Sequence, residues 1–418
     1  MEALKIVPPA TAKPHFSDVF ARGSRNSLNV LRLTFALAVV VSHAFPLSGR
    51  SEPKIGNTTL GTVAVYGFFV ISGFLITRSR RTRPGGGRYL WHRFLRIYPG
   101  YWVCLIVTGL GFATISYAHE HGSLAGWSPA AGLHYMAANA TIKIRQWNVG
   151  STLEHVPYPI AWDGSLWTLI YEVGCYLAVF VLGAGRALRR PVVLVIFGLL
   201  TVVELVAPER VDRLHVPLRL IRLSDAVPLG LAFAAGALIY MFAERVPVRG
   251  DLAAGSTAVT LLGLALLDHA VWLTALPMAY AILWLGVRLP LRGMFDTMDI
   301  SYGVYIYAFP VQQIFADFGV GRHAVAFYIL VVLPPILALA YLSRRFIELP
   351  AERLKRWSPA PLDPGHGAHR RRRGGPAGRA ELQTAEQAAP RRSSLGERLE
   401  PKADREPETP TPRVNQAT

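Results

Sequence analysis

The feature that most constrains this chain is a series of apolar blocks, each roughly as long as a helix that crosses a bilayer. A soluble domain has about a quarter of its residues charged, whereas this chain has 17%. Apolar residues make up 51% of the sequence and are concentrated in these blocks. The pattern predicts a membrane protein with many spans.

We predict an all-α fold, a polytopic transmembrane helix bundle of about ten spans. The predicted spans are 28–47, 60–77, 97–117, 165–184, 190–207, 226–243, 252–268, 270–287, 301–318 and 324–343. The spans 252–268 and 270–287 are so close in sequence that they form either a tight helical hairpin or one wrongly divided region. The predicted domains are a cytoplasmic N-terminal segment (1–27), a transmembrane domain (28–345) and a disordered, basic cytoplasmic tail (346–418).

The formal net charge of +17 is compatible with nucleic-acid binding or with the cytoplasmic loops of a membrane protein. The Lys and Arg residues lie at the ends of apolar blocks and in the tail, so we expect membrane lipid and no nucleic acid as a partner. With ten spans, the basic groups fall on one side, as the positive-inside rule requires. The exception is the loop 208–225, which carries Arg210, Arg213, Arg219 and Arg222.

This arrangement predicts a multi-pass protein of the bacterial inner membrane with both termini in the cytoplasm. Residues 1–27 lack a cleavable signal pattern, so we interpret the first apolar block as a retained span. Cys104 and Cys175 lie inside apolar blocks with no disulfide or zinc spacing, and no metal site is predicted. The long external loop 118–164 is rich in Trp, His and Tyr, which suits either sugar binding or an interfacial aromatic belt.

The first span carries two polar residues on one helical face. Arg32 and His43 are eleven positions apart, which is close to three whole turns and about 16 Å of rise. Polar residues within spans are costly and usually functional. Taken singly, Arg32 is equally well explained by snorkelling to headgroups, and His43 by an interfacial position.

The fourth predicted span carries Glu172 at a depth comparable with that of His43. A carboxylate near a histidine orients a general base and stabilises its imidazolium. We therefore predict that Glu172 lies beside His43. The alternative is that Glu172 is a structural partner of another buried polar group.

A basic cluster opens the third predicted span. Arg93 and Arg96 are three positions apart and share a helical face. Arginine forks suit phosphate recognition, although ordinary positive-inside charge would also place arginines here. Aromatic and apolar neighbours put this pair at the membrane boundary, which favours a role in binding phosphates.

At these residues the sequence resembles the acyltransferase 3 family of integral membrane acyltransferases. The resemblance covers roughly residues 26 to 355. The matching motifs, in order, are Arg32-x10-His43, the segment from Phe68 to Leu75, Arg93-x-x-Arg96 with Pro99, the segment from Trp167 through Glu172 to Tyr176, Ser301 to Tyr305 with Phe309-Pro310, and Glu348 with Pro350. Departures from the family pattern are Tyr66 where many members have Asp, Val173 where many have Glu, and Ala308 where many have His.

The resemblance implies an O-acyltransferase that takes an acyl group, commonly acetyl, from acyl-CoA as co-substrate, with no permanently bound cofactor. The acceptor it implies is a carbohydrate hydroxyl, as in an exopolysaccharide, a lipopolysaccharide precursor or a lipid-linked glycan. His43 would be the catalytic base or acyl carrier, Glu172 would orient it, and Arg32 would stabilise charge along the donor's path. Arg93 and Arg96 would hold donor phosphates. The alternative function is a transporter or flippase of lipid-linked glycans, a class that usually shows internal repeats. The sequence has no convincing repeat, and it leaves the oligomeric state open.

Overall fold

The computed structural model describes residues 14–21, 25–82, 85–159, 161–206, 222–291, 293 and 298–357. Within these ranges the chain is mostly helical, and its strands form one short antiparallel hairpin of β1 (Lys54–Ile55) and β2 (Thr58–Thr59). The predicted all-α class is confirmed. Most of the external loop 208–225 and the tail from residue 358 onward lie outside the described residues.

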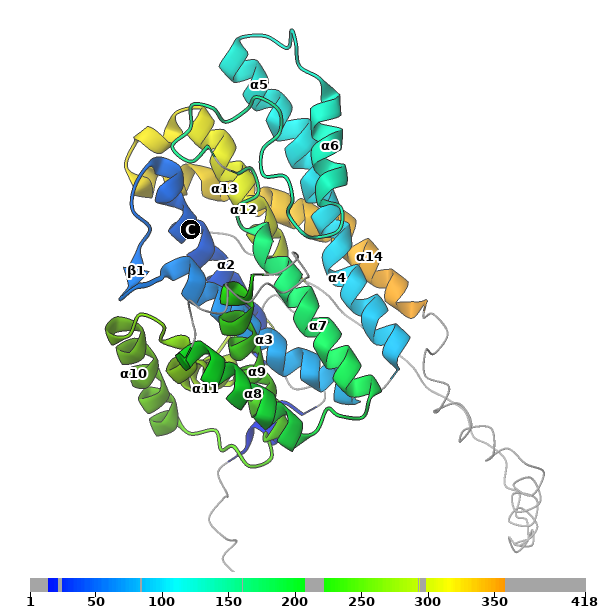
Figure 1. Cartoon of the computed structure of the whole chain (residues 1–418), viewed down its shortest axis with the longest axis vertical. Helices are drawn as coiled ribbons and strands as arrows, with labels where there is room; N and C mark the ends of the chain where they lie inside the picture. Colours follow the sequence, from blue (N-terminus) through cyan, green and yellow to red (C-terminus); the bar gives the residue numbers. More distant parts are fainter. Residues whose placement is uncertain are drawn as a thin grey trace, which may run out of the picture. The chain divides into compact units, whose positions relative to one another are not determined.

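The helices follow one another as shown in Figure 1. The α-helices are α1 (Phe16–Val19), α2 (Leu28–Ala44), α3 (Leu60–Thr82), α4 (Gly86–Ile106), α5 (Ala113–His121), α6 (Pro129–Asn139), α7 (Leu169–Ala184), α8 (Arg190–Val206), α9 (Leu223–Met241), α10 (Gly250–Leu266), α11 (Val271–Arg288), α12 (Ser301–Asp317), α13 (Val325–Ser343) and α14 (Leu349–Arg353). Short 3-10 helices are η1 (Pro46–Ser48), η3 (Leu166–Thr168), η5 (Val320–Arg322) and η7 (Leu354–Arg356). Two π-helical turns are η2 (Val107–Phe112) and η6 (Arg344–Glu348).

Each of the ten predicted spans coincides with a helix of the structure. Among the described residues, seven helical segments are long and apolar enough to cross a membrane: Leu28–Ser48, Leu60–Thr82, Gly86–His121, Leu166–Ala184, Leu223–Met241, Val271–Arg288 and Val325–Arg356. The other three predicted spans are α8, α10 and α12, with 17 residues each. Helices α10 and α11 pack against each other, so residues 252–287 form the tight hairpin. The chain is a multi-pass membrane protein.

Two boundaries differ from the prediction because charged stretches are helical here. Helix α4 begins at Gly86 rather than at residue 97, so Arg93 and Arg96 lie well inside a helix. The predicted tail boundary at residue 346 is wrong, because η6, α14 and η7 continue the helical path of α13 to Arg356. This C-terminal segment packs on α4, where the Trp91 indole donates to the Leu354 carbonyl at 3.0 Å (Figure 1).

Helices α3 and α9 cross closely because glycines leave room at the contact. A Cβ atom on Gly73 would lie 1.9 Å from the Phe233 carbonyl oxygen, and a Cβ on Gly236 would lie 2.0 Å from the Val70 carbonyl oxygen. Small residues at helix contacts let backbones approach in membrane bundles. Gly73 belongs to the Phe68–Leu75 motif, so that motif has a packing role.

We expect Gly73→Ala to lower the thermal stability of the protein. The clash would be with backbone, which cannot rotate away as a side chain can, and overpacking of this kind costs about 1–3 kcal/mol or more. The measurement is the melting temperature of the detergent-solubilised protein, followed by size-exclusion chromatography after heating. The matched control is Gly198→Ala on α8, where a Cβ meets nothing within 4 Å. That control should melt at or above the wild-type temperature, since alanine favours a helix by about 1 kcal/mol over glycine. Equal melting of Gly73→Ala and wild type would contradict the packing argument.

The external loop predicted over 118–164 is folded onto the bundle. It contains α6, whose end is tied down because the Tyr101 hydroxyl donates to the Asn139 carbonyl at 2.7 Å. Trp162 is fully buried, and its indole N–H donates to the Thr152 hydroxyl at 2.9 Å. Trp162 is therefore a core residue, and neither sugar binding nor an interfacial belt accounts for it.

Asp163 is buried beneath this external segment, where the Tyr135 hydroxyl donates to its carboxylate. Burial raises the pKa of Asp163 to about 7. A carboxyl whose pKa is higher in the folded chain binds its proton more tightly when folded. Its contribution to stability is complete below the unfolded pKa of about 4 and is lost as the pH rises through about 7.

We therefore expect the melting temperature to fall as the pH is raised from about 4 to about 7 and to level off above that. Asp163→Asn removes the ionisation but keeps the shape, so the pH dependence should become flatter in this variant. Thermal melts of both proteins across this range provide the measurement. If the melting temperatures of wild type and Asp163→Asn change in parallel with pH, Asp163 does not titrate in this pH range.

Candidate active site

Helix α2 carries the two polar residues singled out by the first-span pattern, and the structure places them in different pockets. Arg32 lines a pocket near the start of α2, which we call the inner pocket, and His43 lines a pocket near its end, which we call the outer pocket. The apolar run between them is a continuous helix. The rise between the two residues is about 16 Å.

The inner pocket has a volume of about 310 Å³. It brings together Arg32 on α2 with Arg93 and Arg96 on α4. The C-terminal helical segment adds Arg344 and Lys355, together with Glu352, which pairs with both of them. This density of cations inside a helix bundle suits a ligand that carries several negative charges.

An acidic residue bridges two of these arginines. The Asp299 Oδ2 atom lies 2.6 Å from Arg32 Nη1 and 2.9 Å from Arg96 Nη2. Although burial acts in the opposite direction, the two guanidinium groups hold the pKa of the Asp299 carboxyl well below its usual range. On the other side of the fork, Arg96 Nη1 lies 3.3 Å from Glu348 Oε2. Arg96 is thus the centre of a buried ion network that joins α4 to the segment before α12, through Asp299, and to η6 after α13, through Glu348.

Arg93 differs from Arg96. Its guanidinium lies 5.8 Å from the centre of the Tyr176 ring. Its Nε atom is buried and has no hydrogen-bond partner among the residues that the structure describes. Arg32, Arg96 and Arg344 each pair with a carboxylate, whereas Arg93 pairs with none among the described residues, so its guanidinium is the one available to a ligand.

Glu172 lies in the inner pocket, so its predicted pairing with His43 is wrong. Its Oε1 atom accepts a hydrogen bond from the Ser72 hydroxyl at 3.1 Å and another from the Tyr176 hydroxyl. The reason is depth, because Thr168 in the turn before α7 lines the outer pocket, whereas Glu172, one helical turn further along, lines the inner pocket. Glu172 is thus a partner of other buried polar groups in this structure, the alternative that the sequence left open.

The outer pocket has a volume of about 420 Å³ and contains His43. The edge of the His43 ring packs on Phe309, with centroids 5.2 Å apart. Its Nδ1 atom is buried without a hydrogen-bond partner among the described residues. Four further aromatic side chains line the pocket: Tyr66, Tyr158, Trp167 and Tyr305.

Two carboxylates line the outer pocket with His43. Glu52 accepts a hydrogen bond from the hydroxyl of Ser42, the residue before His43, and that hydroxyl also accepts from the Gly61 amide at 2.8 Å. Asp225 accepts from the Tyr171 hydroxyl at 3.1 Å. The segment before β1 and the start of α9 therefore supply the acidic groups that line the outer pocket with His43.

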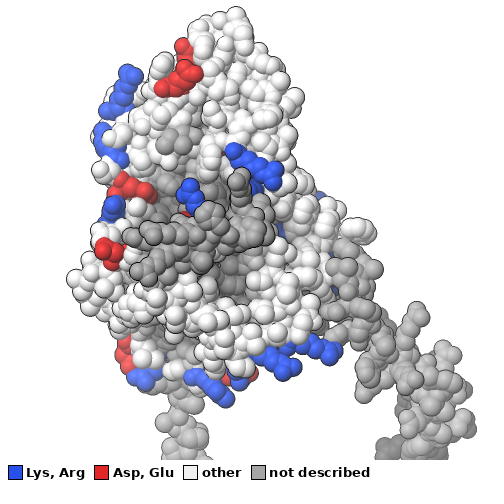
Figure 2. Space-filling model, viewed as in Figure 1, with Lys and Arg blue, Asp and Glu red and all other residues white. Residues whose placement is uncertain are grey.

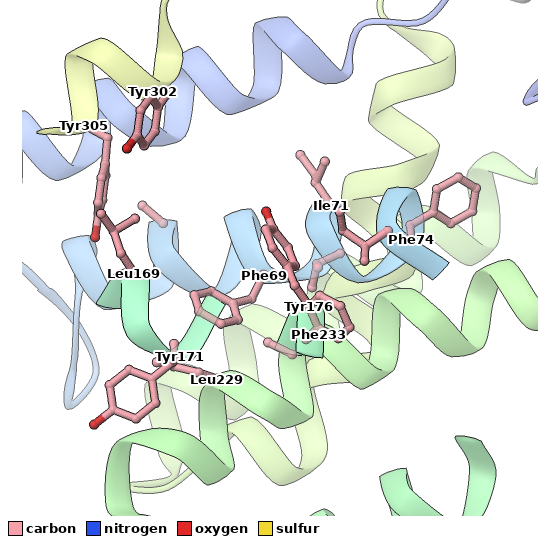
Figure 3. Packing of buried hydrophobic residues seen from close by; sticks show 14 of the residues in the cluster. Phe69, Ile71, Phe74, Leu169, Tyr171, Tyr176, Leu229, Phe233, Tyr302 and Tyr305 are labelled. Atoms are coloured by element: carbon pink, nitrogen blue, oxygen red, sulfur yellow. The ribbon is translucent and has the colours of Figure 1, made fainter. Parts of the chain in front are cut away.

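The two pockets are stacked along the same structural elements. Helix α2 contributes Arg32 to one and His43 to the other, and α12 contributes Tyr302 and Tyr305 in the same way. Figure 3 shows these two tyrosines along one helix, across from α3 and α7. Helix α3 also lines both pockets. A ligand held in the inner pocket is therefore aligned with the outer pocket along the bundle.

Sequence reasoning missed four acidic residues that line the pockets or pair with their arginines: Asp299, Glu348, Glu52 and Asp225. Asp299 stands two residues before the Ser301 motif, and Glu348 belongs to a motif that was used only to identify the resemblance. The position of Asp299 beside a motif was a usable signal. Glu52 and Asp225 lie in connecting segments, and nothing in their local sequence distinguishes them from solvated acids.

The fold and its two stacked polar pockets define a multi-pass membrane protein with a site buried inside the helix bundle. Residues 25–345 match a protein family described as an acyltransferase domain. The chain belongs to this acyltransferase 3 family and is an acyltransferase.

Curated relatives are consistent with this assignment. The chain is 30% identical over 338 residues to an O-acetyl transferase of Shigella phage Sf6, covering 77% of this chain and 95% of that protein. It is 26% identical over 380 residues to nodulation protein 10 of Rhizobium leguminosarum bv. viciae, covering 81% and 96%. A shorter match, 34% over 89 residues, is to acyltransferase MdmB of Streptomyces mycarofaciens, covering 20% and 23%. No solved structure gives a significant match.

Proposed function

We propose that this protein transfers an acetyl group from acetyl-CoA, bound in the inner pocket, to a carbohydrate hydroxyl bound in the outer pocket. The observation that carries the proposal is the stacking of an arginine-rich pocket and a histidine pocket along α2, α3 and α12. A donor with a phosphorylated end and a thioester end needs one pocket that binds its phosphates and a second pocket where its thioester reacts. The name of the Shigella phage relative supports acetyl as the group transferred.

In this proposal the phosphates of the donor bind Arg93 and the neighbouring cations of the inner pocket. Forked guanidinium groups suit phosphate oxygens. The thioester end extends along α2 toward His43, a rise of about 16 Å. Arg32 lies at the start of this path, and its contact with Asp299 keeps its side chain directed into the pocket.

The acceptor binds among the aromatic side chains of the outer pocket, whose flat faces suit a sugar ring. His43 takes the proton from the acceptor hydroxyl as that oxygen attacks the thioester carbonyl. The coenzyme A thiolate leaves and receives the proton from His43. The products are the O-acetyl ester and free coenzyme A. A variant of this chemistry passes the acetyl group through His43 itself.

We place the protein in a bacterial inner membrane with its inner pocket toward the cytoplasm, where acetyl-CoA is made. The positive-inside rule supports this orientation. In Figure 2 lysines and arginines lie along the lower edge of the face shown, and others lie along its upper left edge and near its middle.

The proposal is tested in a deletion strain and with purified protein. The deletion should remove O-acetyl groups from surface or secreted polysaccharide, and the wild-type gene should restore them. Purified protein mixed with acetyl-CoA should release free coenzyme A slowly, and faster once an acceptor carbohydrate is added. Unchanged polysaccharide acetylation in the deletion strain, together with no release of coenzyme A, would refute the proposed function.

A further inference from the structure

A third cavity lies outside the two pockets of the active site, and we call it the basic side pocket. It has a volume of about 260 Å³ and lies where α1, α3, α8 and α9 meet. Helix α3 contributes Phe74, Arg78 and Arg81 to it, but Ser72 and Leu75 to the inner pocket. At about 100° per residue these two sets point to different sides of α3. The basic side pocket is therefore a separate site.

Three guanidinium groups line the basic side pocket against one carboxylate. Arg190 is occupied, because its Nη2 atom lies 2.8 Å from Glu244 Oε2 and its Nε atom donates to the Met241 carbonyl. Arg81 donates one hydrogen bond to the Leu188 carbonyl at 2.9 Å. The Arg78 side chain has no ion pair or hydrogen bond among the residues that the structure describes. The pocket thus keeps an excess of positive charge that no described residue neutralises.

The wall of this pocket is aromatic and held in place. The Phe20 and Phe74 rings lie 4.7 Å apart, and the Phe74 and Tyr240 rings lie 5.6 Å apart. The short helix α1, which Phe20 follows directly, is fixed to the segment after α9 by backbone hydrogen bonds, including one from the Phe16 amide to the Val246 carbonyl at 3.1 Å. An apolar wall beside free guanidinium groups matches the boundary between a lipid headgroup and its acyl chains.

We propose that the basic side pocket binds a phosphate group, supplied by the headgroup of an anionic phospholipid. Basic pockets between transmembrane helices on the cytoplasmic side are suited to such headgroups. Arg78 provides the fork for the phosphate oxygens, and Arg81 has donor hydrogens beyond its single contact with Leu188. The glycerol and upper acyl chains pack on Phe20 and Tyr240. This site does not depend on the proposed acetyl-CoA chemistry, and its occupancy would stabilise the contact of α1 with α3 and α9.

The test uses the purified full-length chain in a neutral detergent. Native mass spectrometry and thermal melts are recorded with dioleoyl phosphatidylglycerol, with dioleoyl phosphatidylcholine and with inorganic phosphate. Phosphatidylglycerol should bind and raise the melting temperature, and phosphatidylcholine should not. Arg78→Gln should weaken phosphatidylglycerol binding about tenfold or more, since hydrogen bonds to charged groups are the strong ones. Because no described residue pairs with Arg78, the variant should fold normally.

The matched control is Arg88→Gln. Arg88 is an exposed arginine near the start of α4, and it lines none of the three pockets. The Arg88→Gln variant should bind phosphatidylglycerol as the wild type does. If inorganic phosphate displaces the lipid, the pocket is a phosphate site open to soluble anions. If the lipid stays bound in the presence of phosphate, the pocket is a lipid site. Equal binding by wild type and Arg78→Gln, or equal weakening by Arg88→Gln, would overturn the proposal.

Discussion

Replacing His43 with alanine is expected to lower the rate of acyl transfer by about 10²–10⁴-fold, the usual contribution of a general base. His43 is the histidine that lines the outer pocket. The donor arginines lie one pocket away, so the affinity for acetyl-CoA should stay unchanged. The measurement is the turnover of radiolabelled acetyl-CoA to an acetylated acceptor, with donor affinity measured separately by equilibrium binding.

Two further variants make this result specific. His43→Gln keeps much of the side-chain volume but cannot act as a base, so it should be as inactive as His43→Ala while melting like wild type. His323→Ala removes an exposed histidine that packs edge to face on Phe327 and lines none of the three pockets, and it should leave turnover unchanged. Wild-type turnover by His43→Ala would show that His43 is neither the base nor the acyl carrier, and the proposed mechanism would fail.

The helices could be predicted from sequence because a bilayer leaves an apolar block of about twenty residues almost no alternative to a helix. The failures occur where helices carry charge. Residues 86–96 and 346–356 contain many basic residues and look like loop or tail in isolation. They are helical because their charges find partners in each other, as Arg96 does with Glu348. Such pairing is visible only once the two segments are placed side by side.

The same limit applies to the site. Arg32 and His43 belong to one helix, so their shared face and separation follow from helical geometry alone. Glu172 belongs to another helix, and its depth relative to His43 was inferred only from its distance to the end of a predicted span. Thr168, just before α7 begins, lines the outer pocket, whereas Glu172, one helical turn further, lines the inner pocket. There the Ser72 and Tyr176 hydroxyls donate to its carboxylate. Predicted span ends are uncertain by about two to four residues, which is as large as the single helical turn that separates the two pockets here.

Arg93 and Arg96 look equivalent in the sequence, but we expect different results when each is replaced with alanine: Arg96→Ala should lose folded protein, and Arg93→Ala should fold but bind acetyl-CoA more weakly. Arg96→Ala would leave Asp299 with only Arg32, and Glu348 with only Arg344, inside the bundle. Removing one partner of a buried ion pair costs about 3–5 kcal/mol, a large part of a total stability of about 5–15 kcal/mol. The variant should therefore give little monodisperse protein on size-exclusion chromatography of solubilised membranes.

Arg93→Ala should fold, because Arg93 contacts the Tyr176 ring and pairs with no carboxylate among the described residues. Its loss should raise the KM for acetyl-CoA about tenfold or more, the cost of a charged hydrogen bond to phosphate, with a smaller change in kcat. Arg96→Lys serves as the intermediate case, since it keeps the charge but loses the fork that reaches Asp299 and Glu348 together, and should recover part of the folded protein. If Arg93→Ala and Arg96→Ala lose the same amount of folded protein, the two arginines form one structural network. The unpartnered Nε atom of Arg93 would then not mark the place where the donor binds.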